Sequence, residues 1–122
     1  MKASVLLVVL IGILAGLIGA LCGVGGGIVM VPAFVKILGF EQKRAVATSL
    51  AVIIIITVSA TINNQRAAGS LIDWKTVAIV GLGAALAAWF GSDLMRSMSN
   101  STLTRMFGVV LLLIGAQMLW KG

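Results

Sequence analysis

Histidine is absent from this chain of 122 residues, cysteine and proline each occur once, and acidic residues number only three. Without histidine the usual zinc ligand sets cannot be assembled, and the single Cys22 excludes an intrachain disulfide. The sequence also contains no Ser-His-Asp set and no Walker loop. We therefore predict no metal site, no cofactor and no enzymatic activity.

Charge is scarce as well. Charged residues make up 10% of the chain and hydrophobic residues 61%, whereas a soluble domain carries about 25% charged residues. The mean hydropathy is +1.20. Because a chain this short buries only about 60–70% of its surface, it cannot hide so much apolar surface from water. The composition predicts an all-α, polytopic membrane protein whose solvent is lipid.

The net charge of +6 is not gathered into one patch. Basic residues fall in ones and twos between apolar runs, which is typical of loops flanking membrane helices. Nucleic-acid binding needs a basic stripe instead, so we expect none. The residues concerned are Lys2, Lys36, Lys43, Arg44, Arg66, Lys75, Arg96, Arg105 and Lys121.

Four apolar blocks divide the chain, and no linker separates them. We predict one membrane domain over residues 1–122, with segments at about 5–38, 45–62, 74–92 and 103–120. Met1 and Lys2 before an apolar run resemble a secretory signal, but hydrophobicity continues past Gly27, so we expect the segment to be retained.

Several residues mark the predicted helix ends. Asp73 is placed to cap a helix that begins at Trp74, and Ser99 to Ser101 are placed to cap the last one. Asp93 and Arg96 lie three apart and predict a local ion pair. Small residues also recur at four-residue spacing, which predicts close helix packing; the rows include Gly12/Gly16, Gly19/Gly23, Gly81/Ala85 and Ala87/Gly91.

The first block is broken by glycine. Its 33 apolar residues would reach about 50 Å as one helix, against a hydrocarbon core of about 30 Å. Gly23 and Gly25 to Gly27 interrupt it, and Pro32 follows. Glycine permits the positive φ angles that turn successive N–H groups towards one point. A helix starting near Ile28 would direct its N-terminal dipole to the same place. The break predicts either an anion site near mid-membrane or a kink that only allows close packing.

The charges bear on the path of this first segment. If it crosses the membrane once, the basic residues divide four against five between the two sides. If it turns back at the glycines, they divide six against three, which is the stronger asymmetry. We favour the re-entrant hairpin. Three full crossings would then remain, so that two copies would meet as an inverted pair.

Neutral polar groups open and close the second segment. The hydroxyls of Thr48 and Ser49 are suited to donate to an oxyanion, or else to bond back to the preceding helical turn. Asn63 and Asn64 close the segment and are expected to be interfacial caps rather than ligands. No acidic residue lies within a segment, so no proton-relay carboxylate and no counter-ion for a cationic drug are expected.

Taken in order, GLIGALCGVGGGIVMVPAFVKILG, AVATSLAVIIII, GSLIDW and LTRMFGVVLLLIGAQML resemble one repeat of the TauE/SafE sulfite exporter family, also called the TSUP permeases. The resemblance covers nearly the whole chain. It implies a multi-pass protein of the cell inner membrane that moves sulfur-containing anions such as sulfite, thiosulfate or organosulfonates. Residues matching the family signature are Gly23, Gly25, Gly26, Gly27, Pro32, Thr48, Ser49, Asp73 and Trp74.

Family members usually carry two such repeats, so the resemblance implies a half-size form that pairs with a copy of itself or with a related half. We expect Gly23, Gly25, Gly26, Gly27, Thr48 and Ser49 to bind the small anionic substrate, and Pro32, Asp73 and Trp74 to be structural. Two alternatives stay open: a small dimeric anion channel, and a membrane subunit that transports nothing.

Overall fold

A computed structural model describes residues 5–67, 69 and 71–122, and these residues form helices and no strand. The helices are α1 (Val5–Cys22), α2 (Gly27–Lys36), α3 (Gln42–Arg66), α4 (Trp74–Ser97) and α5 (Asn100–Lys121). Four of them are long and apolar enough to cross a membrane, namely α1, α3, α4 and α5. The predicted all-α polytopic class is therefore confirmed, and the chain is a multi-pass membrane protein.

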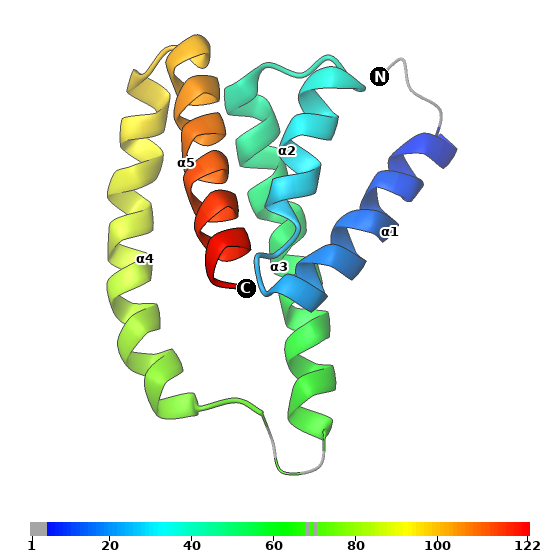
Figure 1. The fold of residues 1–122 in the computed structure, drawn as a ribbon, viewed down its shortest axis with the longest axis vertical. Helices are drawn as coiled ribbons and strands as arrows, with labels where there is room; N and C mark the ends of the chain where they lie inside the picture. The colour runs from blue at the N-terminus through cyan, green and yellow to red at the C-terminus, as the bar shows by residue number, and fades with distance from the viewer. Residues whose placement is uncertain (1–4, 68, 70) are drawn as a thin grey trace.

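The broken first segment is a hairpin. α1 runs obliquely down to the glycines and α2 returns to the end from which α1 came (Figure 1). The 10 residues of α2 span only about 15 Å, half of the hydrocarbon core. The predicted reversal of the chain at the glycines is confirmed, and α2 begins at Gly27, one residue before the predicted start.

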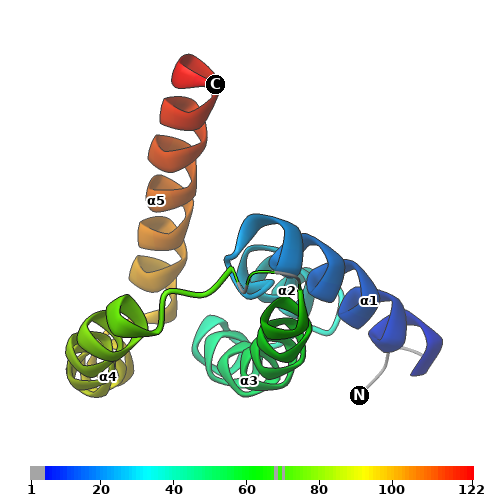
Figure 2. The same ribbon diagram turned by 90° about the horizontal axis from the view of Figure 1, so that it is seen from below.

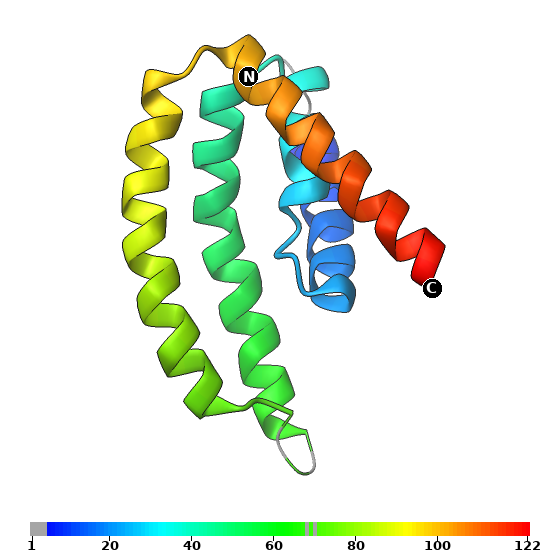
Figure 3. The same ribbon diagram turned by 60° about the vertical axis from the view of Figure 1, so that its left-hand side comes forward.

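The core of the chain lies where this hairpin meets the first half of α3. The buried apolar residues of the described chain come from these three helices, because α1 and α2 pack on each other and both pack on α3. Figure 3 shows α2 between α3 and α1, with α5 crossing in front of them. The buried apolar side chains are Ile11, Ala15, Met30, Val31, Phe34 and Ala45.

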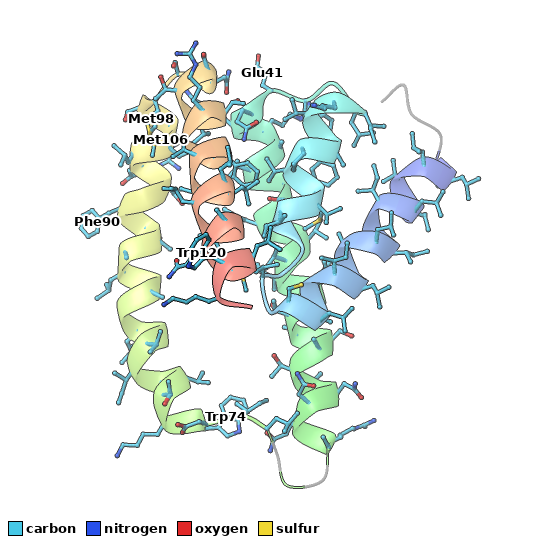
Figure 4. All side chains as sticks on the ribbon, viewed as in Figure 1. Glu41, Trp74, Phe90, Met98, Met106 and Trp120 are labelled. Atoms are coloured by element: carbon cyan, nitrogen blue, oxygen red, sulfur yellow. The ribbon has the colours of Figure 1, made fainter. Side chains whose placement is uncertain are left out.

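Helices α4 and α5 add no buried residue to this core among those described. α5 contacts α3, and its Phe107 packs against the edge of the core, whereas α4 stands apart from α1–α3 in the view from below (Figure 2). On α4, Leu86 is 68% exposed and Trp89 76%, and Phe90 projects outwards from the bundle (Figure 4). These apolar side chains have no partner surface within one described chain.

Polar contacts at its two ends hold α4 near α3. At the upper end the Lys43 ammonium donates to the Arg96 carbonyl of α4 at 3.0 Å, while the Lys43 N–H donates at 3.1 Å to Oδ1 of Asn100, the first residue of α5. At the lower end Trp74 Nε1 donates to Gln65 Oε1 at 3.0 Å. Nothing comparable joins the two helices between these points in the described residues, since α4 has no buried side chain.

The predicted helix-end signals are mostly confirmed. Asp73 caps α4 and Ser99 caps α5, each accepting from the N–H three residues on. Hydrogen bonds from the Thr76 hydroxyl, at 2.6 Å, and from the Thr76 N–H lower the pKa of the Asp73 carboxyl below its usual value. Asp93 and Arg96 form the expected ion pair.

The expected role of Asn63 and Asn64 as caps is wrong. The helix continues past both residues to Arg66, and its C-cap is Ala67, whose N–H donates to the Asn64 carbonyl. Both asparagine side chains therefore project from a helical turn, where they are free to line a cavity.

Candidate functional site

The turn between α1 and α2 depends on glycine for its backbone conformation. The φ angles are +72° at Gly23, +73° at Gly25 and +84° at Gly26, a region that side-chain-bearing residues rarely adopt. Gly26 is the N-cap of α2, and its carbonyl accepts from the N–H groups of Val29 and Met30. The positive φ angles expected at the break are thus present at three of its four glycines.

The same turn also requires glycine for space. A Cβ placed on Gly26 would lie 2.5 Å from the Ala15 carbonyl oxygen, and one on Gly19 would lie 2.5 Å from the Gly26 nitrogen. A Cβ on Gly25 would meet the Ile53 side chain at 2.8 Å. The backbones of α1 and the turn therefore touch directly, which supports the close-packing interpretation of the break.

The turn lies level with the middle of α3. Gly25 and Gly27 both face Ile53, which is 11 residues after Gln42 and 13 before Arg66. At about 1.5 Å per residue, roughly 16 Å of helix lies on one side of this contact and 20 Å on the other. If α3 crosses the bilayer, the glycine turn is at mid-membrane depth, where irregular backbone must be covered by protein or line a wet cavity.

An apolar cavity of about 370 Å³ lies on one side of the turn, between α2, α3 and α5. It brings Gly27 and Ser49 together. The Ser49 hydroxyl donates to the Val46 carbonyl at 2.9 Å, so its proton is already bonded to the preceding turn. The other lining residues are Val31, Val46, Leu50, Ile53, Leu103, Met106, Phe107 and Val110.

A polar cavity of about 200 Å³ lies on the other side of the turn, between α1 and the second half of α3. Gly23 and Gly25 contribute their backbone to it, and Thr57, Thr61 and Asn64 contribute polar side chains. The remaining lining residues are Gly19, Ala20, Ile56 and Ala60. Within residues 5–67, 69 and 71–122, no charged side chain lines either cavity.

The predicted binding residues are therefore divided between two places. Gly27 and Ser49 face the apolar cavity, and Gly23 and Gly25 face the polar one. Gly26, which is buried against Ala15, and the half-buried Thr48 line neither. Binding of substrate by these residues stays a prediction. The residues predicted to be structural lie elsewhere: Pro32 within α2, and Asp73 and Trp74 at the start of α4.

Sequence reasoning missed Thr57 and Thr61, and it assigned Asn64 to a cap. Their spacing of i, i+4 and i+7 places them on one face of α3. A search for neutral polar residues at helical spacing within an apolar segment would have found them, because in lipid such groups must face protein or water.

Curated proteins similar to this chain are named as membrane transporters. The probable membrane transporter protein YunE of Bacillus subtilis (strain 168) is 32% identical over 116 residues, covering 92% of this chain and 40% of that protein. A probable membrane transporter protein of Methanocaldococcus jannaschii is 27% identical over 87% of this chain and 41% of its own. One from Xylella fastidiosa (strain 9a5c) is 28% identical over 91% and 42%. No solved structure matches the chain.

The chain thus spans about two fifths of the length of the curated relatives it matches. The match to a family model is more complete. The model of the sulfite exporter TauE/SafE family covers residues 1–118, which is almost all of the sequence, including the glycine turn and both cavities. This coverage shows that the chain belongs to the sulfite exporter TauE/SafE family.

Proposed function

We propose that this chain is a subunit of a membrane transporter for small sulfur-containing anions such as sulfite, thiosulfate or organosulfonates. The observation that carries the proposal is the glycine turn at the middle of α3, with a polar cavity beside it. Membership of the TauE/SafE family supports both the transport activity and the class of anion. The proposed location is the cell inner membrane.

The residues proposed to contact the substrate are grouped around the turn. Gly23, Gly25, Gly26 and Gly27 offer backbone N–H groups without side chains to obstruct an anion. Within the described residues, the N–H of Gly25 has no hydrogen-bond partner although the residue is buried. Thr48 and Ser49 remain proposed hydroxyl contacts, and Ser49 would have to turn its proton from the Val46 carbonyl to the anion in order to donate to it.

The proposed active unit is a homodimer. The exposed apolar faces of α4 and α5 support this, because no other part of the described chain covers them. Glycine and alanine recur on α4 where a Cβ would meet open space, as at Gly81 and Gly91. Such faces allow a helix of another subunit to approach closely. A second copy with the opposite orientation would supply a second hairpin and complete the enclosure of the turn.

Flux into proteoliposomes tests the proposal. The purified protein is reconstituted, and uptake of radiolabelled sulfite, thiosulfate and a sulfonate is followed at increasing concentration. We expect saturable uptake of at least one of them, abolished in Gly26→Ala and retained in Gly12→Ala, whose Cβ would meet no atom. Uptake of none would overturn the proposal, and rapid unsaturable conductance would instead support an anion channel.

A further inference from the structure

We propose that Thr61 and Asn64 of α3, facing the glycine turn, donate the hydrogen bonds that hold the oxyanion head of the substrate. This inference rests on the proposed transport function and names binding residues that the sequence patterns did not. The site is the polar cavity of about 200 Å³ described above, to which Gly23 and Gly25 contribute from the opposite wall.

The two side chains have donors to spare. The Thr57 hydroxyl, in the same cavity, donates to the carbonyls of Ile53 and Ile54 at 2.7 and 3.2 Å. By contrast, the Thr61 hydroxyl and the Asn64 side-chain amide have no hydrogen-bond partner within the described part of the chain. Thr61 is half-buried and Asn64 exposed in the single chain, so both donors are accessible to a ligand that enters the cavity. An oxyanion, which only accepts hydrogen bonds, suits such a set of free donors.

The electrostatics of the cavity favour reversible binding of an anion. Among the residues that the structure describes, no Asp or Glu lines it to repel a negative charge, and no Lys or Arg lines it to hold the charge as a fixed ion pair. Neutral donors stabilise an anion without the cost of burying a cation beside it. Binding that depends on hydrogen bonds alone is weak enough to reverse, as transport requires.

The positions along α3 also form a route. Thr57, Thr61 and Asn64 follow Ile53 by 4, 8 and 11 residues, which is about 6, 12 and 16 Å along the helix. The polar stripe therefore leads from the depth of the glycine turn to the end of α3 that precedes α4. A neighbouring cavity of about 600 Å³ adds Ser59 and Asn63 along the same half of the helix and shares Ala20, Ile56 and Ala60 with the first.

The test compares isosteric variants in the proteoliposome assay with thiosulfate and methanesulfonate. Thr61→Val and Asn64→Leu remove a donor while keeping the volume. A hydrogen bond to a charged group corresponds to a factor of about ten or more in binding, so each variant should raise the half-saturation concentration about tenfold. Thr57→Val should change it less, because that proton is bonded to the backbone. Thr104→Val is the outside control, since its hydroxyl donates to the Asn100 carbonyl on α5.

The outcomes separate this inference from the function on which it rests. Saturable wild-type uptake with Thr61→Val and Asn64→Leu both unchanged would overturn the donor assignment and leave the transport proposal intact. Absence of uptake in the wild-type protein would overturn the transport proposal itself. Equal increases of the half-saturation concentration in Thr57→Val and Thr61→Val would also overturn the assignment. So would a variant that no longer forms the dimer but keeps the half-saturation concentration of the wild-type protein. Size-exclusion chromatography and helical circular dichroism of each variant identify a failure to fold.

Discussion

Glycine has two different surroundings in this molecule. In the hairpin, a Cβ on Gly19 or Gly26 would collide with the backbone of the neighbouring element. On α4 and α5, a Cβ on Gly81, Gly91 or Gly108 would meet no atom within 4 Å. The same contrast holds for burial: in the described part of the chain, every buried residue lies between Ile11 and Ser49.

This difference shows which part of the chain is well packed without a partner. The hairpin and the first half of α3 form a packed unit in which contacts within one chain account for Gly19, Gly25 and Gly26. Helices α4 and α5, by contrast, carry rows of small residues that contact no other helix of the described chain. In lipid, close packing replaces the hydrophobic drive between helices, so these rows acquire a role only against a partner.

The largest effect should come from changing the hairpin glycines, which differ in two separate properties. Gly26 has positive φ and a backbone contact, Gly19 has only the contact, and Gly23 has only positive φ. A left-handed conformation costs a side-chain-bearing residue about 1–2 kcal/mol, and overpacking costs about 1–3 kcal/mol. We expect Gly26→Ala to lower the free energy of unfolding by about 2–5 kcal/mol. Gly19→Ala should lose only the part due to overpacking, and Gly23→Ala only the part due to the left-handed conformation.

Unfolding in mixed detergent micelles, followed by circular dichroism, measures these differences. Gly12→Ala is the matched control, because Gly12 is helical and a Cβ there meets nothing; it should be neutral or stabilising by up to about 1 kcal/mol. If all four variants lost the same stability, the distinction between strain and contact would fail.

The next effect concerns the exposed rows on α4. Gly81→Leu should leave the helical content of the single chain unchanged, because nothing lies near that position. It should weaken self-association about tenfold, since a bulky side chain keeps helix backbones apart. Fluorescence energy transfer between labelled copies in liposomes measures the change. Gly12→Leu is the control on α1, and equal association in both variants would place the α4 row against lipid instead.

A smaller effect should follow from removing the hydrogen bond that joins the start of α3 to the start of α5. Asn100→Leu removes the acceptor of the Lys43 N–H, a bond of 3.1 Å between residues 57 positions apart. Loss of such a bond costs about 1 kcal/mol. We expect faster proteolysis at Met98 and Ser99 and faster hydrogen exchange at the start of α5. Ser101→Ala, at an exposed neighbouring position, should change neither rate.

The smallest effect should be a pH dependence at the start of α4. The pKa of Asp73 is lowered by its hydrogen bonds from Thr76, so its capping contribution is present at neutral pH. It is lost as the pH falls through that lowered pKa, below the ordinary value of 3.8. Amide exchange of Thr76 should accelerate in that acid range. Asp73→Asn, which keeps an oxygen acceptor but does not titrate, should show no such acceleration.

Much of the fold could be predicted because its signals are local. Chain length against membrane thickness required a break in the first segment, and Asp73 and Ser99 marked helix starts by capping chemistry alone. The positive φ angles at Gly23, Gly25 and Gly26 followed from residue type. By contrast, the contacts of Gly19 with Gly26 and of Lys43 with Asn100 are tertiary, and nothing in the local sequence identifies the partner.

The site was harder to predict for the same reason. Glycines were identified by their density, but which wall of the turn each would face depends on how α3 packs against the hairpin. Ser49 and Asn64 looked alike as neutral polar groups near the ends of an apolar segment. Packing assigned them to different cavities, one lined by apolar side chains and the other by Thr57 and Thr61.

The reversal of the chain at the glycine turn affects whether the number of membrane crossings is odd or even. If the hairpin of α1 and α2 enters and leaves the bilayer on one side, and α3, α4 and α5 each cross it, the number of complete crossings is odd. The start of α1 and the end of α5 would then belong to opposite faces of the bilayer. Any copy of this unit joined to that end in a single polypeptide would begin on the far face and be inserted upside down. A gene duplication would therefore produce two repeats with inverted topology in one step, with no change to the fold of either repeat.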